Sequence, residues 1–169
     1  MIFFSGIFIM GNAPDICLIS IFLIRISNGN EIMVEYTVKT GKIRVAEYQL
    51  LRHTTDWFQL EDNVVEKSLD NDLFALTVYE EERPVGMGRV VGDGAIYFYI
   101  QDIIVIPEYQ GKGIGRLIMD NIEDWLSGAS YENSFVGLMA AEGVSGFYER
   151  YGYLERPSSK PGMSKLMKG

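Results

Sequence analysis

Apolar and polar residues alternate with two different periods along the chain from Met33 onward. Apolar side chains at every second position predict a strand over residues 34–41, and apolar side chains three or four residues apart predict helices over residues 43–55 and 60–69. The strongest helical pattern covers residues 112–126 and predicts a helix with one face in the core. The apolar stripe of this helix contains Ile114, Leu117, Ile118, Ile122 and Trp125.

Further strands are expected in the middle and near the end of the chain. Residues 73–107 contain three apolar runs separated by the turn clusters EEERP and GDG, and they predict three successive strands. The last run is strongly apolar and is expected to be buried on both faces. Residues 135–141, 143–152 and 153–167 predict a buried strand, a helix closed by Gly152, and a loop with a final strand. This order predicts an α/β (α+β) fold, with a mixed, mostly antiparallel sheet, a central β-α-β unit and helices on both faces.

The first 32 residues differ from the rest of the chain. They are rich in Ile and Phe, but polar residues interrupt them, and the longest apolar run is shorter than the ~20 residues of a membrane-spanning helix. Three interpretations follow: a stretch read through in frame upstream of a start at Met33, a weakly membrane-associating tail, or an additional packed element. We therefore treat residues 1–32 as an atypical extension and expect one domain over residues 33–169.

Composition narrows the chemistry. A chain of 169 residues is long enough for one domain with its own core. The formal net charge of -8 disfavours a nucleic-acid partner and favours cationic substrates such as amines. Cys17 is the single cysteine and His53 the single histidine, so the sequence has neither a disulfide framework nor a His/Cys metal cluster. We expect a reduced, cytoplasmic protein that needs no metal and has no membrane partner.

The segment PEYQGKGIGRLIMD, residues 107–120, carries the clearest chemistry. Gly111, Gly113 and Gly115 occupy alternate positions before the predicted helix, so the backbone there can approach a ligand and turn its N–H groups outward. A helix start adds free N–H groups and a partial positive charge of about half a unit. The segment therefore predicts an anion site for a phosphate or diphosphate. Its glycine spacing fits neither a P-loop nor a dinucleotide fingerprint.

Two segments resemble the GNAT superfamily, the acyl-CoA-dependent N-acetyltransferases. Residues 110–115 fit the pattern Q-x-x-G-x-G after the strand end DIIVIPEY, and GFYERYGYLERP, residues 146–157, is similar to the family's second conserved region. The resemblance covers about residues 33–169. It implies the GNAT fold and a single N-acetyltransferase domain. It also implies transfer of an acetyl group from acetyl-CoA to a primary amine by direct attack, and the acidic composition favours a small cationic amine.

The resemblance also implies where acetyl-CoA would bind as co-substrate. The glycine segment is expected to hold the diphosphate. The preceding strand is expected to separate from the strand at residues 135–141, so that the pantetheine arm pairs with open backbone and the N–H of Val105 points at the thioester oxygen. The implied binding residues are Ile103, Ile104, Val105, Gln110, Gly111, Lys112, Gly113, Ile114, Gly115 and Arg116.

Tyr148 is the first candidate for a catalytic side chain. It lies in FYERYG, where the family places a tyrosine that donates to the departing thiolate, and the unperturbed pKa values of a phenol and a thiol, about 10 and about 8.5, suit this exchange. The sequence does not decide which base takes the proton from the incoming ammonium. The candidates are Asp102, Glu142 and a chain of water molecules.

Two other functions are compatible with the sequence. One is a non-catalytic domain that binds or senses acyl-CoA, which would keep the glycine segment and could dispense with Tyr148. The other is an acetyltransferase for the amino groups of proteins. Dimers are common among the proteins that the sequence resembles, so a homodimer is one of the expected states.

Overall fold

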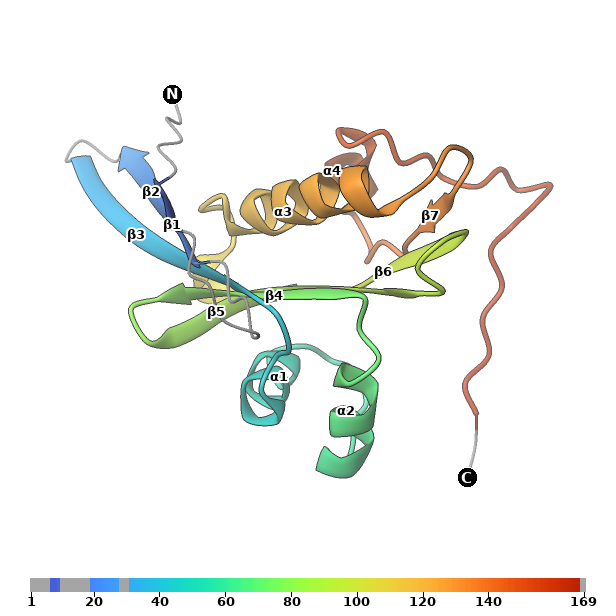
Figure 1. The fold of residues 1–169 in the computed structure, drawn as a ribbon, viewed down its shortest axis with the longest axis horizontal. Helices are drawn as coiled ribbons and strands as arrows, with labels where there is room; N and C mark the ends of the chain where they lie inside the picture. Colours follow the sequence, from blue (N-terminus) through green and yellow to red (C-terminus); the bar gives the residue numbers. More distant parts are fainter. Residues whose placement is uncertain (1–6, 10–18, 28–30, 168–169) are drawn as a thin grey trace.

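The computed structural model describes residues 7–9, 19–27 and 31–167, with side chains from Val34 onward. Strands of this part of the chain form one sheet with helices on both of its faces (Figure 1). The strands are β1 (Ile7–Ile9), β2 (Ile19–Ser27), β3 (Glu31–Thr40), β4 (Phe74–Glu80), β5 (Arg83–Gly92), β6 (Tyr97–Val105) and β7 (Phe135–Gly137). The helices are α1 (Val45–Arg52), α2 (Asp62–Leu69), α3 (Ile114–Ala129) and α4 (Ser145–Glu149), with a 3₁₀ turn η1 (Pro107–Tyr109).

The strands lie side by side in the order in which they occur in the chain. All neighbours from β1 to β6 are antiparallel, and β6 pairs with β7 in parallel after the crossover through α3. A parallel pair needs such a crossover, because a short turn can only reverse the chain direction. The expected α/β fold with a mixed, mostly antiparallel sheet and helices on both faces is confirmed.

The position of the β-α-β unit differs from the expectation. It lies at the end of the described sheet rather than at its centre, because residues 153–167 form no strand. Pro157 and Pro161 lack the N–H that a strand donates to its neighbour, and the apolar side chains of this segment, such as Leu154 and Met163, are exposed. The prediction of a final strand was wrong.

Burial of β6 and β7 was also overestimated. Phe98 and Ile100 of β6 are buried, but Tyr97 and Gln101 are exposed, so the strand does not have both faces in the core. β7 stops at Gly137 instead of continuing to residue 141. Apolar composition predicted two fully buried strands, whereas the short β7 leaves the outer part of β6 without a covering neighbour.

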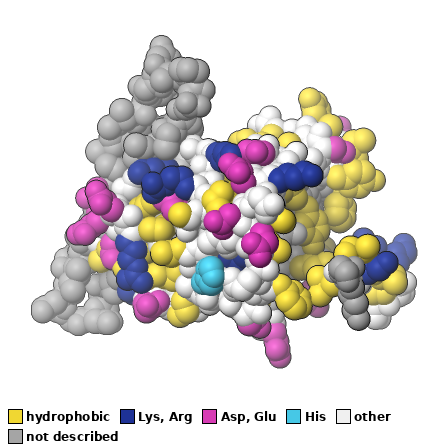
Figure 2. Space-filling view, turned by 90° about the horizontal axis from the view of Figure 1, so that it is seen from below, with side chains coloured by type: hydrophobic (Ala, Val, Ile, Leu, Met, Phe, Trp, Pro, Cys, Tyr) yellow, Lys and Arg dark blue, Asp and Glu magenta, His cyan; other side chains and the backbone are white. Residues whose placement is uncertain are grey.

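The core is formed where α3 packs on one face of the sheet. Its predicted apolar stripe is buried at Ile114, Leu117, Ile118 and Ile122, and Trp125 stacks on the ring of Phe74 with 5.2 Å between centroids. On the other face, α1 and α2 cover β5 and its neighbours (Figure 1). Acidic and basic side chains are interspersed over the outside of that helical layer, and His53 lies among them (Figure 2).

The N-terminal extension contributes strands to this sheet. β2 pairs with β3 from Ile19 opposite Lys39 to Ser27 opposite Glu31. The expected domain boundary between residues 32 and 33 therefore falls inside β3, and the origin of residues 1–32 stays a prediction. Cys17 lies outside the described residues. No helix in the described part of the chain is long and apolar enough to cross a membrane.

Substitution of Gly88 tests the close packing of α3 on the sheet. A Cβ at residue 88 would lie 2.5 Å from Ile118 Cγ2 and 2.8 Å from Ile103 Cδ1, so one of these elements would have to shift. We expect Gly88→Ala to lower the free energy of unfolding by about 1–3 kcal/mol, as overpacked cores do. Urea denaturation measures this change.

Gly128→Ala in α3 is the matched control. A Cβ there meets no atom within 4 Å, and alanine has the higher helix propensity, so the free energy of unfolding should rise by up to about 1 kcal/mol. Similar losses in both variants would contradict the packing argument.

Candidate active site

The candidate site begins where β6 and β7 separate. Their parallel pairing runs from Tyr97 opposite Phe135 to Tyr99 opposite Gly137, and β6 then continues alone to Val105. Residues 100–105 therefore have β5 on one side and no β7 partner on the other. We call the space between the open edge of β6 and the end of β7 the fork.

The backbone N–H of Val105 is directed into the fork. The next residue, Ile106, donates its N–H to the carbonyl of Val85 in β5 at 3.0 Å. Successive residues of a strand present their backbone groups to opposite sides, so the N–H and C=O of Val105 point away from β5. The carbonyl accepts a hydrogen bond of 3.1 Å from Gln110 Nε2, which agrees with that direction.

The glycine segment lies directly after the fork and leads into α3. Gly111 and Gly113 have φ angles of 74° and 91°, a region that favours glycine, and Gly113 caps α3 without any side-chain hydrogen bond. The first N–H groups of a helix have no partner inside the helix. A Cβ added at Gly111 would meet no atom within 4 Å, so open space adjoins this backbone. These features are compatible with an anion site, and the diphosphate expected here stays a prediction.

Tyr148 lies on α4 and is held by aromatic neighbours. Its ring packs edge-on against those of Phe147 and Tyr153, with 5.0 and 6.5 Å between centroids. Its hydroxyl has no hydrogen-bond partner among the described residues, and burial raises the pKa of this phenol above its usual value. The side chain is therefore a fixed, protonated donor at neutral pH.

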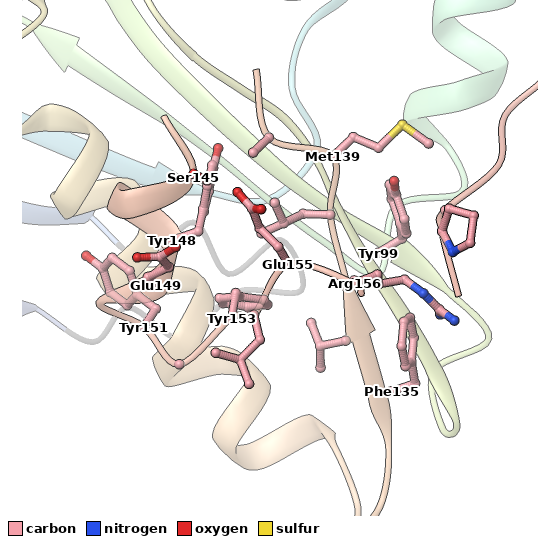
Figure 3. Close-up of a pocket in the computed structure, with 18 of the residues that line it drawn as sticks. Tyr99, Phe135, Met139, Ser145, Tyr148, Glu149, Tyr151, Tyr153, Glu155 and Arg156 are labelled. Atoms are coloured by element: carbon pink, nitrogen blue, oxygen red, sulfur yellow. The ribbon is translucent and has the colours of Figure 1, made fainter. Parts of the chain in front are cut away.

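Tyr148 also lines a cavity of about 900 Å³ between β7, α4 and the segment after α4 (Figure 3). Aromatic and apolar side chains such as Tyr99, Phe135 and Met139 form much of its wall. The charged side chains on this wall are Glu123, Glu149, Glu155 and Arg156. With three carboxylates and one guanidinium, the cavity favours a cationic ligand with an apolar body. The residues of the glycine segment do not line it.

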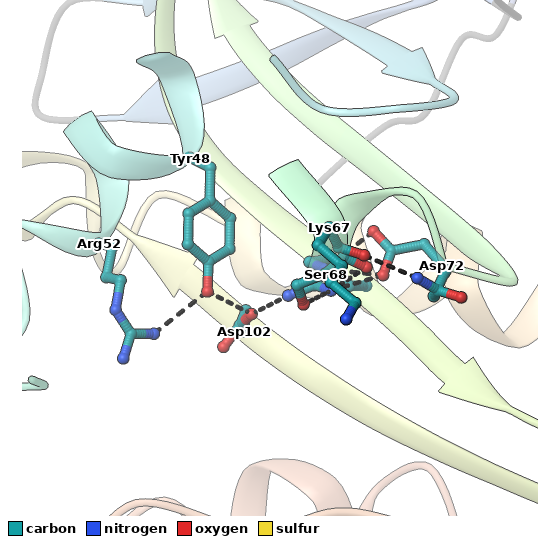
Figure 4. Close-up of polar contacts among 8 residues, drawn as sticks. Tyr48, Arg52, Lys67, Ser68, Asp72 and Asp102 are labelled. Carbon is teal, nitrogen blue, oxygen red and sulfur yellow. Dashed lines mark hydrogen bonds and ion pairs between the residues drawn. The ribbon is translucent and has the colours of Figure 1, made fainter. Parts of the chain in front are cut away.

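Asp102 belongs to a buried polar network instead of facing the cavity (Figure 4). Its Oδ2 accepts from Arg89 Nη1 at 2.5 Å and from the Tyr48 hydroxyl at 3.0 Å. Arg89 also donates from Nε to Asp72 Oδ2 at 2.9 Å and from Nη2 to Ser68 Oγ at 2.9 Å. The side chains of Arg89, Asp72 and Asp102 are only 4%, 5% and 9% exposed.

Pairing dominates the electrostatics of this network. Desolvation by burial disfavours the Arg89 cation, but the carboxylates of Asp72 and Asp102 outweigh it and raise the pKa of the guanidinium. Burial raises the pKa of Asp72, which the same guanidinium opposes, and burial together with Asp102 raises the pKa of Tyr48. A buried charge needs such partners, because an unpaired one costs several kcal/mol.

The other candidate base, Glu142, lies in an exposed turn before α4 and does not line the cavity. Of the predicted site residues, the structure places Tyr148 on the cavity wall, whereas Val105, the glycine segment and both candidate carboxylates do not line that cavity. Their common role in one site stays a prediction. Among the described residues, no group of His, Cys, Asp or Glu side chains is arranged to hold a metal ion. Sequence reasoning missed Arg89, although a lone arginine in the apolar strand VGMGRVVG signals a buried ion pair.

Comparisons with known proteins agree on one family. The sequence matches the family described as "Acetyltransferase (GNAT) domain" over residues 46–162. It is 30% identical over 130 residues to an uncharacterized N-acetyltransferase ycf52-like protein of Prochlorococcus marinus, covering 73% of this chain and 71% of that protein. It is 35% identical over 82 residues to serotonin N-acetyltransferase 2, chloroplastic, of Oryza sativa subsp. japonica, covering 48% and 40%. A solved structure from meticillin-resistant Staphylococcus aureus, a protein of unknown function and probable acetyltransferase, has a TM-score of 0.73 and 32% identity, covering 78% and 99%.

Removal of Arg89 tests the buried network. We expect Arg89→Met to lower the free energy of unfolding by about 3–5 kcal/mol at neutral pH, as the loss of one partner of a buried ion pair does. Without the guanidinium, the pKa of Asp72 in the folded state rises further above its unfolded value. The loss is therefore largest above that pKa and shrinks as pH falls through it.

Urea denaturation between pH 5 and pH 8 measures this dependence. The control is Lys42→Met, which removes the exposed ion pair of Lys42 with Asp70 and should change the free energy of unfolding far less. A loss in Arg89→Met that does not vary with pH would contradict the assignment of the network as charge pairing.

Proposed function

Because the chain belongs to the acetyltransferase (GNAT) family, we propose that it transfers an acetyl group from acetyl-CoA to a primary amine by direct attack. The fork supports this proposal most directly, since an open strand edge with an inward N–H lies next to a glycine-rich helix start. Acetyl-CoA, when bound, supplies the activated acetyl group as a thioester. The chain itself has to hold that molecule, polarise its carbonyl and donate a proton.

Backbone groups would bind acetyl-CoA in this scheme. The N–H groups of residues 111–116 would bind the diphosphate, with Gln110, Lys112 and Arg116 beside them. The open edge at residues 103–105 would pair with the pantetheine arm as a further strand does. Both roles need only backbone that is turned outward, as the left-handed glycines and the missing β7 partner allow.

The N–H of Val105 would stabilise the negative charge that develops on the thioester oxygen during attack. Loss of one such donor typically raises the barrier by about 2.7–4 kcal/mol. Tyr148 would donate to the sulfur as it departs. Because burial raises the pKa of this phenol, it stays protonated at neutral pH and suits a hydrogen-bond donor better than a group that gives its proton away completely.

The proton of the incoming ammonium needs an acceptor. Asp102 already accepts from Arg89 and Tyr48, whereas Glu142 is exposed and has no ion pair among the described residues. We therefore favour a path through water in which Glu142 is the receiving carboxylate. Glu142 could accept the proton without losing an ion pair, whereas Asp102 would weaken its bonds to Arg89 and Tyr48.

The acceptor is proposed to be a small cationic amine with an apolar body. The acidic cavity beside Tyr148 and the net charge of -8 both favour cations, and aromatic walls suit an arylalkylamine. One similar protein is named a serotonin N-acetyltransferase, which agrees with this class. The single cysteine favours a reduced location such as the cytoplasm. The alternatives are a protein amino group as acceptor and an acyl-CoA sensor without turnover.

Turnover tests the reaction and the role of Tyr148. The full chain is mixed with acetyl-CoA and either 2-phenylethylamine, spermidine, an aminoglycoside or a lysine peptide, and loss of the thioester absorbance is followed, which the thiol of Cys17 does not disturb. We expect one amine class to support turnover and Tyr148→Phe to lower kcat by about 10²–10³, the usual effect of removing one hydrogen-bond donor to charge that develops in the transition state. No thioester loss with any amine would refute catalysis on these acceptors.

Tyr36→Phe is the matched control for Tyr148→Phe. Tyr36 is fully buried in the core, and its hydroxyl also lacks a hydrogen-bond partner in the described structure. The control should keep wild-type kcat. An equal loss of kcat in both variants would mean that the effect of Tyr148→Phe is structural.

Substitution of Gly111 tests the diphosphate site. Gly111→Ala places a Cβ on the outward face of the segment at a φ of 74° and should weaken CoA binding at least about tenfold, through loss of close backbone approach. Gly143→Ala is the control, because Gly143 has a φ of 77° and equal free space but lies outside the segment. Calorimetric titration measures the dissociation constant of CoA for both variants. Equal values would contradict the assignment of the diphosphate site to this segment.

A further inference from the structure

β6 carries an irregularity immediately before its open edge. In its register with β5, two residues of β6, Asp102 and Ile103, lie opposite the single residue Gly88. Such a β-bulge interrupts the ladder, and bulges are common beside active sites because they redirect the groups that follow. Asp102 has a φ of 51°, a left-handed conformation that a residue with a Cβ keeps only when its surroundings hold it.

The bulge decides which backbone N–H faces the fork. Regular pairing from Arg89 opposite Gln101 would place Val105 opposite Val85, where the N–H of Val105 would be consumed by the β5 carbonyl. With one extra residue in β6, Ile106 takes that place and donates to Val85 at 3.0 Å. Val105 is then turned to the other side. A shift of one residue exchanges the two sides of a strand. The N–H of Val105 therefore faces the fork because of this bulge.

Three side chains from three elements fix the bulge. Tyr48 comes from α1, Arg89 from β5 and Asp102 from the bulge itself, and both donors converge on Asp102 Oδ2 (Figure 4). Arg89 is fixed in turn by Asp72 and Ser68. Because these groups are buried, a rotation of Asp102 away from its conformation would leave an unpaired charge.

We infer that Tyr48, Arg89 and Asp102 form a positioning unit that holds the β6 bulge and thereby aims the Val105 N–H at the thioester, a role that rests on the proposed function. Asp102 is a positioning residue in this unit and does not take the proton of the ammonium. Its hydrogen bonds fix the backbone conformation of the bulge, and the direction of the Val105 N–H depends on that conformation.

Tyr48→Phe tests the unit with the smallest change, because it removes one hydroxyl and keeps the ring. Tyr79→Phe is the matched control: the Tyr79 hydroxyl donates to Glu47 Oε1 of α1 at 2.7 Å and has no hydrogen bond to Asp102 or Arg89 among the described residues. Asp102→Asn is the stronger variant. We follow kcat of the full chain with acetyl-CoA and 2-phenylethylamine or spermidine, the dissociation constant of CoA, and the Val105 amide signal in ¹H–¹⁵N NMR spectra.

The unit predicts a selective loss. We expect kcat to fall about tenfold in Tyr48→Phe and about 10²-fold in Asp102→Asn, as a misplacement of roughly 1 Å can cause. The dissociation constant of CoA, which has no thioester carbonyl, should change far less than kcat, because the ligand contacts at the glycine segment are untouched. The Val105 amide should shift in both variants and keep its position in Tyr79→Phe. The pH profile of kcat should keep its shape in Asp102→Asn.

Two results would overturn the positioning unit. One is a Val105 amide that stays in place in Tyr48→Phe and Asp102→Asn. The other is loss of the acidic limb of the pH profile in Asp102→Asn, which would make Asp102 the base. A wild-type chain that turns over no amine would refute the proposed reaction alone, and the amide signals would still decide whether the unit holds the bulge.

Discussion

The pairing of β6 with β7 stops at Tyr99, and the rest of the candidate site depends on that ending. Backbone groups in the interior of a protein almost always have hydrogen-bond partners, so a strand edge left open beside a core is costly unless something else pairs with it. An extended ligand with amide groups can take that place as a strand would. α3 begins at Ile114, nine residues after Val105 ends β6, so the glycines and the helix start follow the open edge directly in the chain.

The buried charges lie on the face of the sheet opposite α3 and are hydrogen-bonded to the bulge residue Asp102. Arg89 lies between two carboxylates, and none of the three side chains is more than 9% exposed. Such networks rarely stabilise a fold more than apolar packing would, because desolvation offsets most of the attraction. What this network adds is direction: it ties α1 and β5 to the bulge of β6, while α3 packs against Gly88 on the other side. β6 is thereby in contact with α3 on one face and with α1 on the other.

Most helices and strands and the glycine segment could be predicted from the sequence, because each depends on residues that are close in the chain. The stripe of α3 follows from its helical period, and the strands of residues 73–107 follow from apolar runs separated by turn clusters. The bulge was not predictable, since Asp102 adopts its conformation through partners 13 and 54 residues away. The prediction of a final strand was wrong for a local reason, the prolines within residues 153–167. The expected domain boundary at Met33 falls inside β3. The roles of Tyr148, Asp102 and Glu142 remain predictions.

A crystal structure of the full chain with a non-hydrolysable acetyl-CoA analogue is the most direct test of the fork. The account predicts the diphosphate on the N–H groups of residues 111–116, the pantetheine arm along the open edge of β6, and the carbonyl oxygen within about 2.7–3.2 Å of the Val105 nitrogen. An analogue bound elsewhere, or a fork closed by pairing of β7 along residues 100–105, would contradict it.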